Sequence, residues 1–168
     1  MSKIKKHYEL KVQPTIKVLL YGQPGIDKST LALSAPSPLF IDFDNGVHRV
    51  QPQHQNDTVP VEKWEDVIEL LDEDLSAYQT LIIDTAGKML DYVSDYLIRQ
   101  NPKFKKSDGN LTQQGYGARK NTFRQFFAKI SLLGKNLVFI AHDKEEKDED
   151  LKFVRPDGGG SSGGDLIK

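Results

Sequence analysis

Residues 16–31 read Ile-Lys-Val-Leu-Leu-Tyr-Gly-Gln-Pro-Gly-Ile-Asp-Lys-Ser-Thr-Leu, and they carry the strongest structural signal in this chain. An apolar strand runs into a turn with Gly22 and Gly25, and Lys28 and Ser29 then precede a helical segment. Glycines let the backbone curl so that successive N–H groups point inward, and the helix that follows offers its positive end. The stretch is therefore typical of a nucleotide-phosphate loop of the pattern G-x-x-x-x-G-K-[ST].

The side chains of this loop have expected roles. Lys28 would reach the β- and γ-phosphates as a point charge, and Ser29 would supply a hydroxyl to Mg²⁺. The residues expected to bind the cofactor are Gly22, Gln23, Pro24, Gly25, Ile26, Asp27, Lys28, Ser29 and Thr30. The alternative is a strand–turn–helix connection that uses its glycines only for the turn.

Asp27 departs from the pattern, which has glycine immediately before the lysine. Asp tolerates unusual backbone angles better than most residues, so the loop can still form. A carboxylate ~5 Å from one phosphate charge costs roughly 3 kcal/mol at an effective dielectric of ~20, less whatever Mg²⁺ neutralises. The cost is near zero if the side chain turns to solvent. Weak ATP binding, a relative that binds no nucleotide, and an inactivating substitution all stay open.

Apolar strands alternate with helical patterns along the rest of the chain. Strands are predicted at 16–21, 39–44, 58–61, 80–83 and 137–141, and helices at 29–34, 64–75, 89–98 and 118–133. Loops are predicted at 45–57 and 101–117, and a hairpin at 143–155 that turns at Glu149-Asp150. Uniformly apolar strands need cover on both faces. The sequence therefore predicts an α/β fold with a mainly parallel sheet flanked by helices.

Several polar residues stand at the predicted carboxyl ends of these strands, where sheets of this kind bind their ligands. They are Gly22–Lys28, Asp42, Asp44, Asp84 and His142. Asp84 ends an apolar strand, and nucleotide hydrolases place such a carboxylate beside the phosphate loop to hold Mg²⁺. The alternative is an ordinary aspartate that caps the next helix. The convergence of these positions on one sheet edge predicts a single site.

Four motifs together resemble the RecA-like P-loop ATPases. They are the phosphate loop, Phe40-Ile-Asp-Phe-Asp44, Leu81-Ile-Ile-Asp-Thr85 and Val138-Phe-Ile-Ala-His142. More closely, the chain is similar to the phage-type nucleotide-binding proteins of the AAA/RecA group, some of which are single-strand annealing recombinases. The likeness covers about residues 15–168. It implies one RecA-like nucleotide-binding domain over residues 1–168.

The resemblance also implies roles for single residues. Lys28, Ser29 and Asp84 would bind Mg-ATP, with Ser29 and Asp84 on the metal. Asp44 would orient the attacking water and His142 would sense the γ-phosphate, so these two are the expected catalytic residues. The alternatives are that Asp44 caps the turn at Asn45-Gly46, and that His142 bonds a neighbouring carbonyl.

The bulk composition narrows the class of protein. A length of 168 residues suits one domain, with an N-terminal extension over 1–13 and a Gly/Ser-rich tail over 156–168. The absence of cysteine excludes disulfides, and no apolar run is long enough for a membrane helix. A cytoplasmic location is expected. The chain ends before the last strands of a full RecA-type core, so the sequence leaves open whether it is a truncated fragment.

Residues 101–129 form a basic region with seven Lys or Arg residues and one acid, Asp108. Phe104 and Tyr116 stand among them, which suits a mobile loop that follows a phosphate backbone and stacks bases. The alternative is a solvated loop before the charged face of a helix. Family members often oligomerise so that a basic residue reaches a neighbour's ATP. Arg119 or Arg155 could do this, although an ordinary surface arginine is the simpler interpretation.

These observations predict an ATP-binding protein of phage or mobile-element origin, an Mg²⁺-dependent ATPase linked to single-stranded DNA recombination. Expected partners are ATP, single-stranded DNA through 101–129, and a second copy in a homo-oligomer; no membrane contact is expected. The alternative is a scaffold or interaction module in which Asp27 impairs nucleotide binding. The third candidate function is a small-molecule kinase, but this chain lacks the arginine-rich lid that such kinases need.

Overall fold

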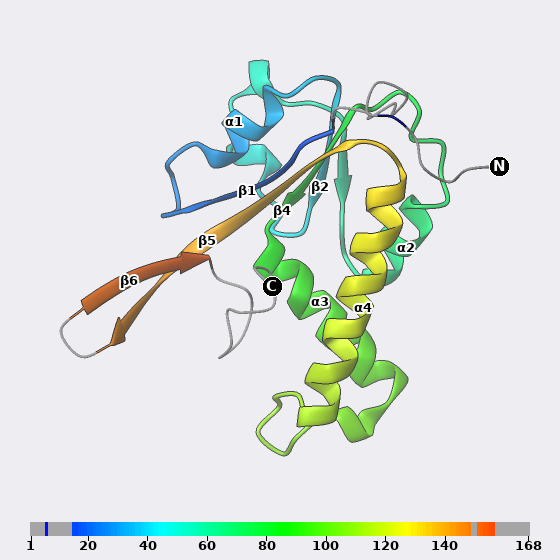
Figure 1. Cartoon of the computed structure of the whole chain (residues 1–168), viewed down its shortest axis with the longest axis vertical. Coiled ribbons are helices and arrows are strands. Elements are labelled where there is room, and N and C mark those ends of the chain that lie inside the picture. Colours follow the sequence, from blue (N-terminus) through cyan, green and yellow to red (C-terminus); the bar gives the residue numbers. More distant parts are fainter. Residues whose placement is uncertain (1–5, 7–14, 149–150, 157–168) are drawn as a thin grey trace.

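The computed structural model describes residue 6, residues 15–148 and residues 151–156 (Figure 1). The rest of the expected N-terminal extension, the turn at Glu149-Asp150 and the tail beyond Pro156 lie outside these residues. The strands are β1 (Lys17–Gly22), β2 (Pro38–Asp42), β3 (Thr58–Pro60), β4 (Thr80–Asp84), β5 (Asn136–Asp148) and β6 (Leu151–Pro156). The helices are α1 (Lys28–Leu33), α2 (Trp64–Leu70), α3 (Ala86–Gln100) and α4 (Gln113–Leu132), with 3-10 turns η2 (Val47–Arg49), η3 (Pro52–His54) and η4 (Pro102–Phe104).

The sheet has the strand order β1-β5-β4-β2-β3, and these five strands are parallel. β6 pairs antiparallel with the far part of β5, so the predicted hairpin is confirmed. The register sets Gly22 beside His142 and Asp42 beside Asp84. The α/β fold with a mainly parallel sheet is thus confirmed, and the carboxyl ends of β1, β2 and β4 meet at one edge.

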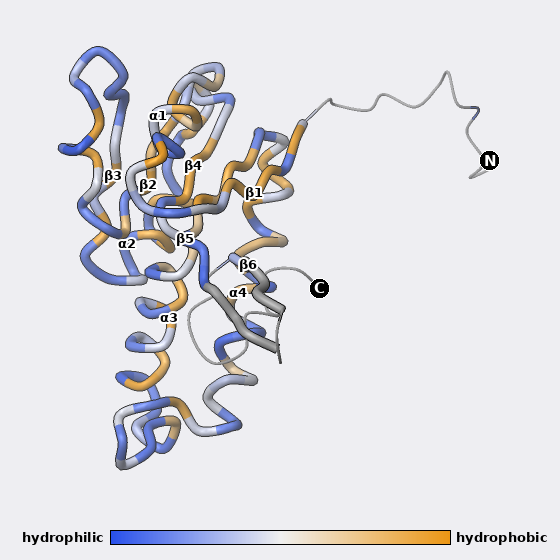
Figure 2. The backbone as a smooth tube through the Cα atoms, turned by 90° about the vertical axis from the view of Figure 1, so that its left-hand side faces the viewer, coloured by the Kyte–Doolittle hydropathy of each residue, from blue (hydrophilic) through white to orange (hydrophobic). Residues whose placement is uncertain are grey.

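Alternate residues of the central strands face opposite layers. On one face, Leu81, Ile83 and Phe139 pack with α2, α3 and α4 in the larger core. In this core the rings of Trp64 and Phe126 pack edge-on, with their centres 5.2 Å apart. The other face packs against α1 and the segment after η2; its buried residues are Ala32, Leu33, Phe40, Val50, Ile82, Val138 and Ile140. Orange segments of the tube follow these two layers (Figure 2). β2 and β4 are buried at every position, and this two-sided burial explains why most of their residues are apolar.

Element boundaries differ from the prediction where tertiary contacts decide them. α4 begins at Gln113, inside the predicted loop, because the Thr112 hydroxyl accepts the Gly115 N–H at 3.2 Å and caps the helix. The predicted loop at 45–57 contains η2 and η3. β2 ends at Asp42, so Asp44 lies on the loop after the strand. Within the described residues, no helix is long and apolar enough to cross a membrane.

Candidate functional site

The phosphate loop is formed, with Asp27 in the left-handed conformation at φ 59° and ψ 29°. Gly25 also has positive φ, at 82°. Gly22 has φ 154°, and a Cβ atom there would approach Cδ1 of the exposed Ile26 side chain to 2.6 Å, so that side chain would have to turn aside. The expectation that Asp could replace glycine before the lysine is therefore confirmed for the backbone. The Asp27 side chain is exposed and makes no capping hydrogen bond to α1.

Lys28 closes the loop on itself. Its Nζ donates to the carbonyls of Gly22 and Gln23, both at 2.7 Å. These contacts hold the ammonium group against the backbone of the loop. An arriving phosphate would meet a cation that is already in place, although it must compete with two carbonyls for the ammonium protons.

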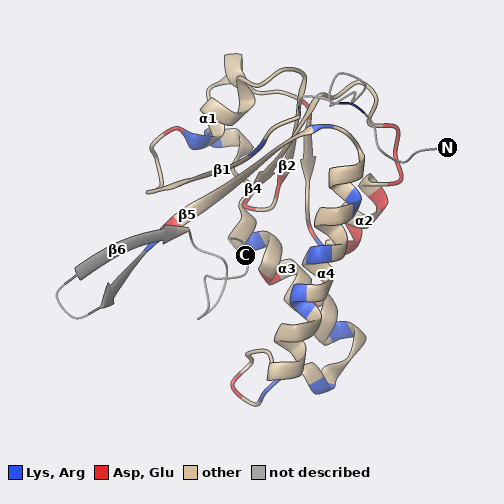
Figure 3. Cartoon of the chain, viewed as in Figure 1, with Lys and Arg blue, Asp and Glu red and all other residues tan. Residues whose placement is uncertain are grey.

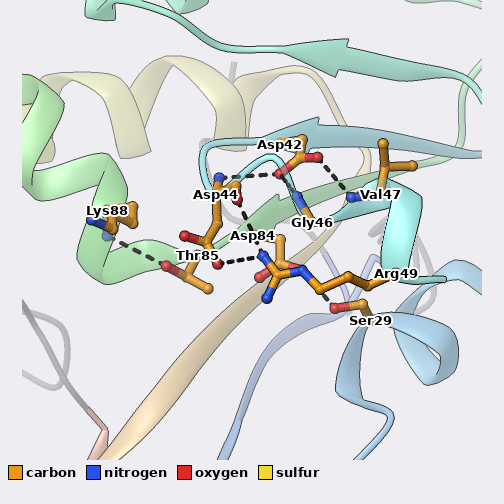
Figure 4. Close-up of polar contacts among 9 residues, drawn as sticks. All are labelled: Ser29, Asp42, Asp44, Gly46, Val47, Arg49, Asp84, Thr85 and Lys88. Carbon is orange, nitrogen blue, oxygen red and sulfur yellow. Dashed lines mark hydrogen bonds and ion pairs between the residues drawn. The ribbon is translucent and has the colours of Figure 1, made fainter. Parts of the chain in front are cut away.

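Ser29 and Asp84 join the loop to the end of β4 (Figure 4). The Ser29 hydroxyl donates to Asp84 Oδ2 at 2.6 Å, and Asp84 is only 6% exposed. Burial raises the pKa of Asp84 above its ordinary value of 3.8, and the Ser29 hydrogen bond opposes this rise. The charges of Asp42 and Asp44 raise the pKa further, while His142 lowers it. A divalent cation beside Asp84 would relieve the carboxylate of this unfavourable surrounding.

Asp42 has a structural role, which the sequence did not indicate. Its carboxylate is 1% exposed and accepts the backbone N–H groups of Asp44, Gly46 and Val47 at 2.9–3.1 Å. All three bonds appear in Figure 4. Asp42 thereby determines the path of the loop that follows β2, and it does not line the cavity described next. The expectation that it would join the site is corrected to a supporting position.

One cavity collects most of the predicted site residues. It is lined by Pro24, Gly25, Asp27, Lys28, Ser29, Thr30, Asp44, Gly46, Arg49, Val50, Asp84, Thr85, Ile140 and His142. Gly22, Gln23 and Ile26 belong to the loop but stand outside the lining. The structure therefore brings Asp44, Asp84 and His142 together with the phosphate loop, as the strand-end argument predicts.

His142 stands beside Gly22 and within β5, which runs on to Asp148. The sequence predicted that His142 follows the end of its strand, whereas the structure places it within the strand. Its ring nitrogen Nδ1 is buried and has no hydrogen-bond partner among the described residues. A buried polar atom without a partner is uncommon, and here it belongs to a residue that lines the cavity. Among the residues that the structure describes, no carbonyl accepts a hydrogen bond from this nitrogen.

Arg49 is the charged lining residue that sequence reasoning missed; Gly46, Val50, Thr85 and Ile140 also line the cavity without having been predicted. Its Nη2 donates to the Asp44 carboxylate at 3.0 Å and to the Asp44 carbonyl at 3.2 Å. Asp44, the expected water-orienting acid, is therefore paired with a cation. The only signal was a basic residue shortly after the Asn45-Gly46 turn, in a stretch predicted as loop.

The side-chain oxygens of this site suit Mg²⁺ that is shared with a substrate better than a metal ion that only protein side chains hold. Ser29 and Asp84 supply a hydroxyl and a carboxylate oxygen, which are ligands that Mg²⁺ prefers. Across the part of the chain that the structure describes, no three His, Asp or Glu side chains gather closely enough to hold a metal ion. Mg²⁺ is usually bound by one or two side chains together with substrate phosphates, so the arrangement fits it.

The basic region lies apart from this cavity, around the connection between α3 and α4 and along α4 (Figure 3). Two of its residues differ from expectation. Phe104 packs against the larger core, and Arg119 is 4% exposed with its guanidinium 4.9 Å from the Tyr116 ring centre. Phe104 is thus not presented for base stacking, and Arg119 is not a surface arginine. Lys103, Lys105, Lys106 and Arg124 are exposed.

Comparison with protein families gives one match, which extends over residues 15–167 and is described as an AAA domain. The matched range begins just before β1 and contains every residue that lines the cavity. No curated protein matches the chain.

Proposed function

Because the chain belongs to the AAA domain family, which is a family of P-loop ATPases, we propose that it binds and hydrolyses Mg-ATP at this cavity. The observation that carries the proposal is the 2.6 Å hydrogen bond from Ser29 to the buried Asp84 carboxylate beside a formed phosphate loop. The loop supplies N–H donors, Lys28 supplies a positive charge, and the paired hydroxyl and carboxylate supply metal ligands. A polyanion with a divalent cation satisfies all three together.

Ser29 and Asp84 would hold Mg²⁺, which neutralises phosphate charge when it is bound. Lys28 would turn from the carbonyls of Gly22 and Gln23 toward the β- and γ-phosphates. The desolvated Asp84 carboxylate favours a cation beside it, because its own surroundings penalise an isolated negative charge. Each of these groups binds or orients, which is most of what phosphoryl transfer requires of a protein.

Asp44 and His142 are proposed to act on the reacting end of the nucleotide. The Asp44 carboxylate would accept hydrogen bonds from the attacking water and orient it. Buried Nδ1 of His142 supports a role in the site, because it lacks a partner within the described residues and belongs to a residue in the cavity lining. A hydrogen bond between this imidazole and the bound ligand would make the ring sensitive to the state of the phosphates.

Calorimetric titration with Mg-ATP tests the proposal. Wild type is expected to bind, and Lys28→Ala is expected to raise Kd by about tenfold or more, because a charge-assisted hydrogen bond is lost. Lys17→Ala is the matched control: this lysine lies on the strand that leads into the loop and bonds Ser131 at 2.9 Å. The proposal fails if wild type shows no heat of binding at millimolar Mg-ATP, or if Lys28→Ala binds as wild type does.

A scaffold or interaction module is the second candidate, and the exposed Asp27 carboxylate in the cavity lining favours it. If this charge prevents binding, wild type will show no thermal shift with Mg-ATP and Asp27→Gly will restore one. A shift in wild type would reject the scaffold.

We further propose that the protein is of phage or mobile-element origin, acts in the cytoplasm as a homo-oligomer, and couples ATP to the handling of single-stranded DNA in recombination. The motif resemblance supports the origin and the oligomer. The exposed Lys103, Lys105 and Lys106 support the DNA contact, because three neighbouring lysines can follow a phosphate backbone.

Fluorescence anisotropy with a labelled single-stranded oligonucleotide tests the DNA contact. Replacing the three lysines by glutamine should weaken binding and reduce the slope of log K against log salt by about 2, since each single-strand contact contributes about 0.7. Lys63→Gln, an exposed lysine on α2's side of the molecule, should leave the slope unchanged. An unchanged slope in the triple variant would reject the contact.

A further inference from the structure

Arg49 has a position that the fold itself does not require. Its side chain is 60% exposed, and its Nη2 atom bonds only to Asp44 among the hydrogen bonds of the described residues. Yet it lines the same cavity as Lys28, Ser29 and Asp84. The pair between Arg49 and Asp44 is close in geometry to many surface ion pairs, which contribute little to stability. A role in the cavity explains its placement better than a role in the fold.

The backbone that carries Arg49 is firmly held. Asp42 accepts the N–H groups of Gly46 and Val47, and Gln55 Nε2 donates to the carbonyls of Val47 and Val50 at 3.2 and 2.9 Å. Val50 is 6% exposed in the smaller core, and Val47 packs against that core. The 3-10 turn η2 is therefore anchored on both sides of the arginine. A fixed base with an exposed guanidinium suits a group that must reach a ligand without reorganising its loop.

Gly46 clears the path of the side chain. A Cβ atom at Gly46 would lie 3.3 Å from Arg49 Nη2 and 3.7 Å from Cζ, so the guanidinium passes directly over this glycine. Figure 4 shows the side chain of Arg49 extending from η2 across to Asp44. The route of the side chain is thus set by the turn and by the absence of a side chain at Gly46.

The carboxylates of the cavity lining mean that a bound triphosphate needs a second cationic side chain beside Lys28. Three carboxylates line it, from Asp27, Asp44 and Asp84, against two permanent cations, Lys28 and Arg49. Asp27 adds a negative charge in the phosphate loop itself. A triphosphate that enters this cavity needs positive charge beyond Lys28 and the metal, and Arg49 is the remaining permanent cation of the lining.

We propose that Arg49 binds the terminal phosphate of the nucleotide, and that Asp44 holds the guanidinium in position until the phosphate takes its place. The proposal deepens the proposed function and rests on it. A phosphate carries more negative charge than a carboxylate and offers a guanidinium the same bidentate geometry, so the exchange of partners is favourable. The transfer also frees the Asp44 carboxylate, which can then accept a hydrogen bond from water.

Two consequences follow for nucleotide selection. Arg49 lies beside Asp44, the acid proposed to act on the reacting end of the nucleotide, so it would contact a triphosphate and leave a diphosphate largely untouched. The preference for ATP over ADP should therefore depend on Arg49, whereas the affinity for ADP should depend on the phosphate loop. Asp44 should oppose ATP binding to the extent that it competes for the guanidinium.

Calorimetric titrations with Mg-ATP and with Mg-ADP test this inference. Arg49→Ala is expected to weaken ATP binding about tenfold or more and ADP binding less than about twofold, because one charge-assisted contact is lost only with ATP. Arg49→Lys should fall between, since an ammonium group keeps the charge and loses the fork. Arg99→Ala is the matched control: this exposed arginine pairs with Glu65 at 2.8 Å, away from the cavity, and should change neither affinity.

Asp44→Asn provides the opposite change. It should tighten ATP binding several-fold by releasing the guanidinium, while turnover of Mg-ATP falls because the carboxylate that orients water is lost. A merely structural pair would leave the ratio of ATP to ADP affinity unchanged in both variants, and that result would overturn the inference. If wild type binds neither nucleotide, the proposed function fails and this inference fails with it. If wild type binds both nucleotides and Arg49→Ala has the same ratio of ATP to ADP affinity as wild type, only the proposed role of Arg49 is rejected.

Discussion

Asp27 takes the left-handed conformation that the phosphate-loop pattern assigns to glycine, at φ 59°. For most L-residues this conformation costs about 1–2 kcal/mol, but Asp and Asn tolerate it because their short polar side chains bond locally. The backbone of the loop therefore survives the substitution. The remaining effect of Asp27 is electrostatic, because its carboxylate is exposed and lines the cavity.

Substitutions at Asp27 separate charge from backbone. Asp27→Asn keeps the tolerance of positive φ and removes the charge, so we expect Mg-ATP to bind about tenfold more tightly, below the unscreened value of about 100-fold. Asp27→Gly should bind at least as tightly. Asp27→Ala should lower the stability by about 1 kcal/mol, because alanine is strained at this φ. Calorimetry and urea unfolding measure both effects; a gain in Asp27→Gly without one in Asp27→Asn would assign the effect to the backbone.

The pKa of Asp84 predicts a pH dependence of stability. Burial raises this pKa above 3.8, so the folded state binds the proton more tightly than the unfolded state does. The resulting stabilisation is complete below pH 3.8 and is lost as the pH rises through the folded pKa. Asp84→Asn, which is neutral throughout, should be more stable than wild type at neutral pH without metal.

Urea unfolding in EDTA from pH 4.5 to 8 measures this difference, which should shrink steadily toward the acid end. With Mg-ATP the order should reverse, because the asparagine cannot serve as an anionic ligand of the metal. A wild type that is the more stable protein at neutral pH in EDTA would show that the contacts of the carboxylate outweigh its burial.

At the scale of the elements, α4 shows how a helix can begin in a sequence that resembles a loop. Its first turns contain Gly115 and Gly117, which lower helix propensity, yet Thr112 caps the helix and the turn packs closely. A Cβ atom at Gly115 would stand 3.0 Å from the Phe104 carbonyl oxygen and from Leu111 Cδ2. Gly115 is thus required by the close approach of η4, whereas nothing lies within 4 Å of a Cβ at Gly117.

Alanine at these two glycines should have opposite effects. Gly115→Ala is expected to lower the free energy of unfolding by about 1–2 kcal/mol, because the carbonyl it meets belongs to the backbone and cannot turn aside. Gly117→Ala should raise it by about 0.5–1 kcal/mol, since alanine has the higher helix propensity and meets open space. Each serves as the control for the other in urea unfolding; equal signs would contradict the assigned packing of η4 on α4.

For the whole molecule, the sheet edge and the basic region form two separate places. α3 begins at Ala86, two residues after Asp84, and has 15 residues, so its far end lies about 22 Å away at 1.5 Å per residue. The exposed lysines follow that far end. A nucleotide and a nucleic acid strand would therefore contact the molecule at opposite ends of α3 without competing for space.

The sheet is buried on both faces, and we propose that the chain is a single domain that unfolds in one step. Trp64, the only tryptophan, is 3% exposed in the larger core and reports on it by fluorescence. Its transition in urea should coincide with that of the far-ultraviolet circular dichroism. Mg-ATP should move both midpoints upward together, because a ligand of the folded state stabilises all of it. Two separate transitions would indicate more than one unit.

Local pattern was enough to predict the fold class and the meeting of Lys28, Asp44, Asp84 and His142 at one edge. Strand period and apolar content are properties of neighbouring residues, and the parallel arrangement then brings strand ends together by geometry alone. The strand-end rule needs no side-chain contacts. For this reason a sequence with one unusual loop residue still indicated which residues meet at this edge.

The paths of the loops decided the rest. Asp42 became a support because the loop after β2 folds back so that three N–H groups meet its carboxylate. Arg49 entered the cavity because that loop carries it over Gly46, and Phe104 joined the core because η4 docks on α4. The apolar period does not encode these outcomes. The contacts of Asp42 and Arg49 span two to five residues and depend on how the loop after β2 turns, whereas the packing of Phe104 depends on where η4 meets α4. The apolar period and the order of strands and helices along the chain determine which residues lie at the sheet edge. The paths of the loops in space determine which side chains and N–H groups these residues contact.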